Sequence, residues 1–149
     1  MKLQLKSLLI FLGASFILFT GFKSAGLRDA QILQANGQSS PVSIRTSFTG
    51  GAFPTLTGTF TTNGAIETSG DIVMDMYPNV SGIRSHFVLT LVSSNGTITI
   101  HQNCVFSNLS SKGNWKIVNG TGAYTNLKGN GSVLMLPFGE EMEGDISKN

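Results

Sequence analysis

The stretch WKIVNGTGAYTNLKGNGSV, residues 115–133, holds four glycines, two lysines and no acidic side chain. A P-loop would end its glycine-rich turn in Gly-Lys-Ser/Thr and then open a helix. Here Lys128 precedes Gly129, and the run that follows is strand-like. A dinucleotide fingerprint G-x-G-x-x-G is not completed either, because Thr125 stands at its last position. The stretch therefore does not predict a phosphate site.

The same residues predict a change of chain direction. A strand bearing Trp115 ends at Asn119-Gly120, and the next six residues suffice for about one helical turn that places Tyr124 on the core. Gly129 and Gly131 then let the following strand pass close to another backbone. Both aromatic side chains supply large buried area and carry a polar group that needs a partner.

The rest of the chain reads as short strands separated by turns. Runs rich in Thr, Val, Ile and Phe alternate with Gly, Asn and Ser, and Asn-Gly recurs five times. Asn-Gly favours tight hairpins, so the pattern predicts an all-β antiparallel meander. Residues 27–40 are weakly patterned and form an arm or a first strand, while residues 41–149 form the folded domain. Pattern alone leaves a sandwich and a barrel equally open.

Residues 86–106 form the clearest hairpin. A two-residue turn at Asn95-Gly96 pairs Leu91 with Ile100 and Phe87 with Cys104, on one apolar face that looks into the core. An inward thiol in apolar surroundings has a raised pKa and is inert. Cys104 is the only cysteine, so no internal disulfide forms and the domain depends on its core.

The histidines and the acidic residues do not suggest a metal site. In that register His101 lies opposite Thr90, about 13 Å from His86, which is too far for a shared metal ion. The acidic segment GEEMEGD, residues 139–145, lacks the spacing of an EF-hand. We expect it to form a charged turn or a protected edge strand, and we expect no metal.

The N-terminus has the three-part pattern of a secretory signal peptide, residues 1–26. Lys2 and Lys6 form the basic start, a largely apolar run of 15 residues follows, and Ser24 and Gly26 are small residues suited to cleavage. The apolar run is shorter than the roughly 20 residues that span a bilayer. We expect cleavage, export to the periplasm or the extracellular space, and no stable membrane anchor in the mature chain.

The mature chain carries little net charge. After Gly26 there are seven basic and eight acidic side chains, a net charge of −1, and the basic ones are scattered. This excludes the electrostatic footprint of nucleic-acid binding and a polybasic membrane patch. No cofactor motif is present, so we expect no cofactor.

Residues 113–133, GNWKIVNGTGAYTNLKGNGSV, resemble the C-terminal strand–turn–strand of small exported barrel domains related to the allene oxide cyclase and dirigent families. The shared pattern is a Trp-bearing strand, then G-T-G-A-Y-x-x-L-x-G-x-G, then another strand. Residues 56–70 and 96–106 resemble the corresponding hairpins of uncharacterised bacterial members. The resemblance covers about residues 55–146. It implies that the meander closes into a roughly eight-stranded, calycin-like barrel with a small apolar cavity, often as a homotrimer.

We therefore expect an exported β-barrel protein that binds a small hydrophobic ligand or a protein partner without catalysis. The alternative is a cyclase- or isomerase-like enzyme acting on a hydrophobic substrate inside the barrel cavity. A third possibility is a structural subunit that assembles through valines on its outer faces. No catalytic residue is assigned. The candidate ligand-binding residues are Arg45, Glu67, Arg84, His101 and Tyr124.

Overall fold

The computed structural model of the protein describes residues 37–107 and 111–149. The expected signal peptide and residues 27–36 of the expected arm lie outside these ranges. The described chain consists of strands and one short 3-10 helix. These are β1 (Ser40–Ala52), β2 (Thr55–Gly64), β3 (Thr68–Pro78), β4 (Arg84–Ser93), β5 (Gly96–Val105), β6 (Ser111–Gly120), η1 (Gly122–Tyr124), β7 (Leu127–Leu136) and β8 (Gly139–Lys148).

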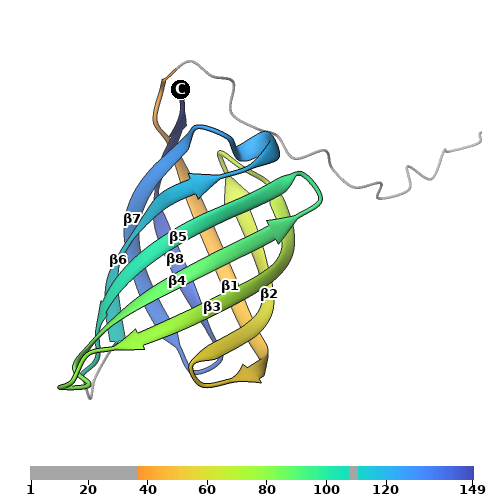
Figure 1. Cartoon of the computed structure of the whole chain (residues 1–149). Helices are drawn as coiled ribbons and strands as arrows, with labels where there is room; N and C mark the ends of the chain where they lie inside the picture. The colour runs from red at the N-terminus through yellow and green to blue at the C-terminus, as the bar shows by residue number, and fades with distance from the viewer. Residues whose placement is uncertain (1–36, 108–110) are drawn as a thin grey trace, which may run out of the picture.

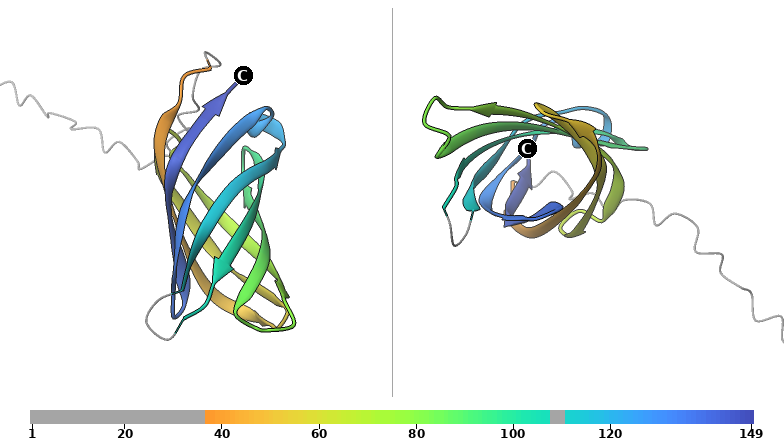
Figure 2. Two further views of the ribbon diagram at one scale, coloured as in Figure 1. Left: turned by 90° about the vertical axis from the view of Figure 1, so that its left-hand side faces the viewer. Right: turned by 90° about the horizontal axis from the view of Figure 1, so that it is seen from below.

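The eight strands form one closed antiparallel barrel (Figure 1), which confirms the predicted all-β meander and the barrel implied by the resemblance. Each strand pairs with its neighbours in the sequence, and β8 closes the ring by pairing with β1. Figure 2 shows the closed ring from below. The expectation of a charged turn or a protected edge strand at residues 139–145 is wrong, because these residues belong to β8, which is paired on both sides.

Side chains alternate between the interior and the surface along the strands, as the pleat requires. On β4, for example, Phe87, Leu89 and Leu91 are buried, while Val92 is exposed. All eight strands contribute to a packed apolar interior. Its buried members on the strands are Val42, Ile44, Phe60, Ile72, Met74, Phe87, Leu89, Leu91, Ile98, Ile100, Cys104, Trp115, Ile117, Leu127, Val133, Met142 and Ile146.

The turn between β6 and β7 is the one predicted from the glycine-rich stretch. η1 follows β6 and buries Tyr124, whose side chain is 1% exposed. The Tyr124 hydroxyl lies 3.0 Å from Ser93 Oγ, so its polar end is satisfied. No helix in the described ranges is both long enough and apolar enough to span a membrane.

Two glycines make room for Trp115, the only tryptophan in the chain. A Cβ atom at Gly131 would lie 2.7 Å from the indole Nε1, and one at Gly144 would lie 2.7 Å from Cζ2. The indole N–H donates to the backbone carbonyl of Glu143 at 3.2 Å. The Asn-Gly pair at 130–131 therefore lies inside β7 and serves packing, not a turn.

We expect Gly144→Ala to lower the free energy of unfolding by about 1–3 kcal/mol. The new methyl group would lie 2.2 Å from the carbonyl oxygen of Asn130 and against the indole of Trp115, so backbone or ring must move. Urea denaturation followed by far-UV circular dichroism measures the change. Gly50→Ala is the control, since its Cβ would approach only the Thr57 hydroxyl, at 3.1 Å. Equal losses in both variants would contradict the prediction.

The predicted register of the β4–β5 hairpin is wrong by two residues. Ser93 pairs with Gly96, so Ser94 and Asn95 form the turn, and Leu91 lies opposite Ile98 rather than Ile100. Gly96 is a strand residue at φ +137, and a Cβ there would lie 2.2 Å from the carbonyl oxygen of Thr121. Glycine is needed at this position because the β6–β7 turn packs directly against its backbone. Because the shift is two residues, the buried face is unchanged.

Candidate functional site

The five predicted ligand-binding residues do not meet in one place. Arg45 and Arg84 are exposed on the outer wall of the barrel, and His101 is half-buried on the outer face of β5. Glu67 lies in the connection between β2 and β3, and Tyr124 is buried under the β6–β7 turn. None of the three residues on the wall lines the barrel interior. That these residues bind a ligand stays a prediction.

The two histidines are close together, contrary to the separation of about 13 Å expected from the sequence. The centroids of the His86 and His101 rings are 4.9 Å apart, with the rings edge to face. The reason is the register shift, which places His101 opposite Val88 instead of Thr90. His86 also contacts Asn103 Oδ1 at 3.2 Å through Nδ1. Within the described ranges, no group of three or more His, Cys, Asp or Glu side chains is arranged to hold a metal ion.

A polar cluster lies inside the barrel. Gln102 of β5 donates from Nε2 to Glu140 Oε2 of β8 at 2.9 Å, and the same nitrogen lies 3.1 Å from Met142 Sδ. Cys104 Sγ contacts Gln102 Oε1 at 3.9 Å. Since β5 and β8 are not neighbours in the barrel, the Gln102–Glu140 bond crosses its interior. At this level the barrel is filled by side chains.

Glu140 is the most unusual member of this cluster. It has no exposed surface, and burial raises the pKa of its carboxyl from 4.5 to about 7, although the hydrogen bond from Gln102 lowers it in part. Among the described residues, Oε1 has no hydrogen-bond partner, and neither has the buried hydroxyl of Thr46. Thr46 is the residue opposite Glu140 on β1. Two unsatisfied oxygens thus come from adjacent positions, and protonation gives Oε1 a hydrogen to donate.

Glu140 is not among the residues predicted from the sequence, because the acidic segment 139–145 reads locally as one charged surface. The alternation along β8 contained the necessary signal. Met142 and Ile146 are inward, and Glu140 shares their parity, whereas Glu141 and Glu143 point outward. Strand period, rather than local charge density, identifies the buried acid.

Cys104 is buried, as its predicted inward position implied. Burial and the nearby negative charge of Glu140 raise the pKa of its thiol from 9.0 to about 12. We expect no reaction with a thiol-specific reagent in the native state at pH 8, and one equivalent of reaction in denaturant, because thiolate is the reactive species. The absorbance of the chromophore that the reagent releases measures the extent of reaction in the native and in the denatured protein. Rapid labelling of the native protein would contradict the prediction.

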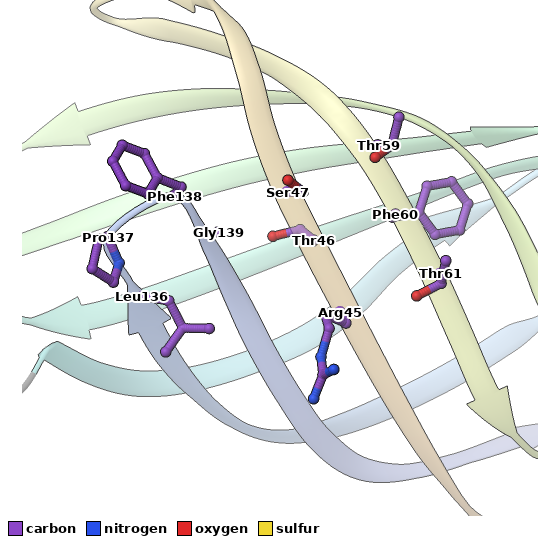
Figure 3. A pocket seen from close by; sticks show the side chains of 10 residues that line it. All are labelled: Arg45, Thr46, Ser47, Thr59, Phe60, Thr61, Leu136, Pro137, Phe138 and Gly139. Carbon is purple, nitrogen blue, oxygen red and sulfur yellow. The ribbon is translucent and has the colours of Figure 1, made fainter.

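A groove of about 430 Å³ lies on the outer wall, over β1 and beside the β7–β8 turn (Figure 3). Phe138 and Leu136 form its apolar side, with 80% and 40% of their surfaces exposed. Arg45 stands at its edge and is held by Glu141, with Nη2 2.7 Å from Oε1. The lining residues are Arg45, Thr46, Ser47, Thr59, Phe60, Thr61, Leu136, Pro137, Phe138 and Gly139.

The chain was compared with protein-family models and with curated proteins. No protein-family model and no curated protein matches the chain. Of the likeness to allene oxide cyclase and dirigent domains, the structure confirms the eight-stranded antiparallel barrel.

Proposed function

We propose that this protein binds a small hydrophobic molecule in the groove over β1, without catalysing a reaction on it. The observation that supports this most directly is the groove itself, which combines an apolar side with a volume of about 430 Å³. Sites for small molecules are concave, mostly apolar and about 300–1,000 Å³ in volume. Phe138, 80% exposed, would lose contact with water on binding, which favours an apolar occupant.

The polar groups around the groove would orient a bound ligand. The hydroxyls of Ser47, Thr59 and Thr61 come from exposed positions on β1 and β2, opposite the apolar side. A ligand with an apolar body and one hydrogen-bonding end fits this division. Arg45 is already paired with Glu141, so its charge is compensated before a ligand arrives.

The resemblance stated above supports the same class of ligand, since those families handle hydrophobic small molecules. We propose, on that resemblance and on the N-terminal pattern, that the protein is exported and assembles as a homotrimer. Native mass spectrometry of the gently purified protein gives the assembly state and the mass of any bound molecule. A monomer without an adduct would contradict both the trimer and a retained ligand.

Blocking the groove tests the proposed site. Ser47→Trp places a large side chain in the groove from an exposed strand position. Titration with anilinonaphthalene sulfonate, followed by the fluorescence of the probe, should show one saturable site that this variant weakens at least about tenfold. Asn114→Trp, at an exposed position of β6 outside the groove, is the matched control and should bind as the wild type does. Equal affinity in all three proteins would refute the groove as the site.

The enzymatic alternative has one observation in its favour. Glu140 carries a carboxyl with a pKa near 7 and a free Oε1 in a barrel interior, which suits general acid–base chemistry near neutral pH. The residue is fully buried, so a substrate would have to enter the packed core. A hydrophobic adduct that the wild type converts, and that Glu140→Gln binds without converting, would favour the enzyme over the binding protein.

A further inference from the structure

The two ends of the barrel carry different side chains. Of the residues that the structure describes, the five most exposed large apolar ones all lie on or beside the β1–β2, β3–β4 and β7–β8 turns, at the lower end in Figure 1. They are Phe53 at 68%, Tyr77 at 55%, Val80 at 110%, Ile83 at 56% and Phe138 at 80% exposed. Three separate turns thus present apolar side chains to solvent at one end.

The opposite end shows no such exposure in its connections. The large apolar residues in these connections, Ile66 and Tyr124, are 2% and 1% exposed. Val92 and Val118, on the strands beside them, are 41% and 46% exposed, less than any of the five residues at the lower end. The β4–β5 turn consists of Ser94 and Asn95. Scattered exposed apolar residues are normal on a protein surface, but this concentration at one end is not scattered.

The centre of the lower end is apolar as well. Five partly buried side chains, four on strands and one just after β5, lie close to this end and pack against the core. They are Phe48, Leu56, Met76, Phe106 and Met135. The apolar character therefore extends from the mouth of the barrel to the turns around it.

Positive charge lies just behind these turns. Arg84 and Lys112 are exposed on either side of Val105, on three adjacent strands. Neither forms an ion pair with another residue in the described part of the chain. The charge of Glu141 is compensated by its ion pair with Arg45. Asp75 accepts a hydrogen bond from the Thr55 hydroxyl at 2.6 Å and not from either cation.

We propose that this end of the barrel docks on a bilayer that contains anionic phospholipid. The turns enter the boundary between headgroups and acyl chains, while Arg84 and Lys112 meet the headgroup charge. Phe138 belongs both to this surface and to the proposed ligand groove, but Val80, Ile83 and both cations lie outside the groove, so variants at these positions test the docking surface separately.

A bilayer fits this surface better than a folded protein partner. Protein interfaces need a complementary patch of about 800 Å² per partner, packed around a buried centre. Here the most exposed side chains stand on three separate turns, and Val80 at 110% exposure is in contact with almost nothing. A fluid lipid surface closes around such projections without requiring a matching shape.

Sedimentation with vesicles tests the proposal. The purified protein should sediment with vesicles made of equal parts phosphatidylcholine and phosphatidylglycerol, and less with phosphatidylcholine alone. The double variant Val80→Asp, Ile83→Asp should bind the mixed vesicles at least about tenfold more weakly. Arg84→Gln with Lys112→Gln should remove the preference for the anionic mixture and reduce the sensitivity of binding to salt.

The matched control is Val118→Asp, at an exposed position on the barrel wall. It should bind vesicles as the wild type does, and unchanged thermal melting confirms that each variant folds. A wild type that stays in the supernatant with both vesicle types overturns the proposal, as does a Val80/Ile83 variant that binds unchanged. Binding to a protein through this end, with no sedimentation, would also overturn it. If the wild type binds vesicles but its groove binds no anilinonaphthalene sulfonate, only the proposed ligand site is refuted.

Discussion

Trp115→Ala is expected to lower the free energy of unfolding by about 3–5 kcal/mol. The indole is 2% exposed and fills the space that Gly131 and Gly144 leave open, so no neighbouring side chain can close the gap. Domains of this size are stable by about 5–15 kcal/mol, so the loss takes a large part of the total. Urea denaturation followed by far-UV circular dichroism measures it, since the variant has no tryptophan fluorescence.

Trp115→Phe separates the effect of volume from that of the hydrogen bond. The variant keeps an aromatic ring but loses the donor that bonds the Glu143 carbonyl at 3.2 Å. We expect a smaller loss than for alanine, of which about 1 kcal/mol comes from the missing hydrogen bond. If phenylalanine and alanine cost the same, the packing of the ring is not what stabilises this part of the barrel.

Glu140→Gln is expected to flatten the dependence of stability on pH. The carboxyl has a pKa of about 7 in the folded protein against 4.5 for its unperturbed value. The unfolded chain therefore releases this proton first, and the contribution of Glu140 to stability is complete below pH 4.5 and lost as the pH rises towards 7. The shift corresponds to roughly 3 kcal/mol. The glutamine variant carries no such proton and should become the more stable protein above pH 7.

The measurement is a series of urea denaturations between pH 4 and 9 on the wild type and two variants. Glu141→Gln is the matched control, because this neighbour points outward and pairs with Arg45 on the surface. It should keep the wild-type pH profile, while Glu140→Gln should lose the fall between pH 4.5 and 7. Parallel profiles for all three proteins would show that the buried carboxyl does not titrate in this way.

The sequence was sufficient for the all-β class, the inward positions of the strands and the burial of the large aromatic residues, but not for the exact position of every turn. Alternation and turn residues are local properties, so they identify the hairpin at residues 86–106 and the inward positions of Phe87 and Cys104. The glycine-rich stretch likewise indicated that Trp115 and Tyr124 are buried with satisfied polar ends. That a ring closes between β1 and β8 came only through the resemblance, since no local pattern encodes a pairing across the whole domain.

The candidate site was far less predictable, for two physical reasons. A shift of two residues preserves the buried face, so nothing in the hydrophobic pattern warned that His86 and His101 are neighbours. Gly96 appeared to be a turn residue, but it is needed where the β6–β7 turn packs on β5, a contact between distant segments. The hydrogen bond from Gln102 to Glu140 likewise joins strands that no sequence rule brings together.

The pairing of β8 with β1 also determines when the chain can finish folding. Seven of the eight pairings join consecutive strands, but the last one joins segments about 100 residues apart. A chain that emerges from its N-terminus holds β1 ready long before its partner exists. Throughout that time the outer edge of β1 offers free N–H and C=O groups to any other extended chain. The barrel therefore closes only when β8 pairs with β1, and a chain interrupted before residue 139 would remain open and prone to aggregation.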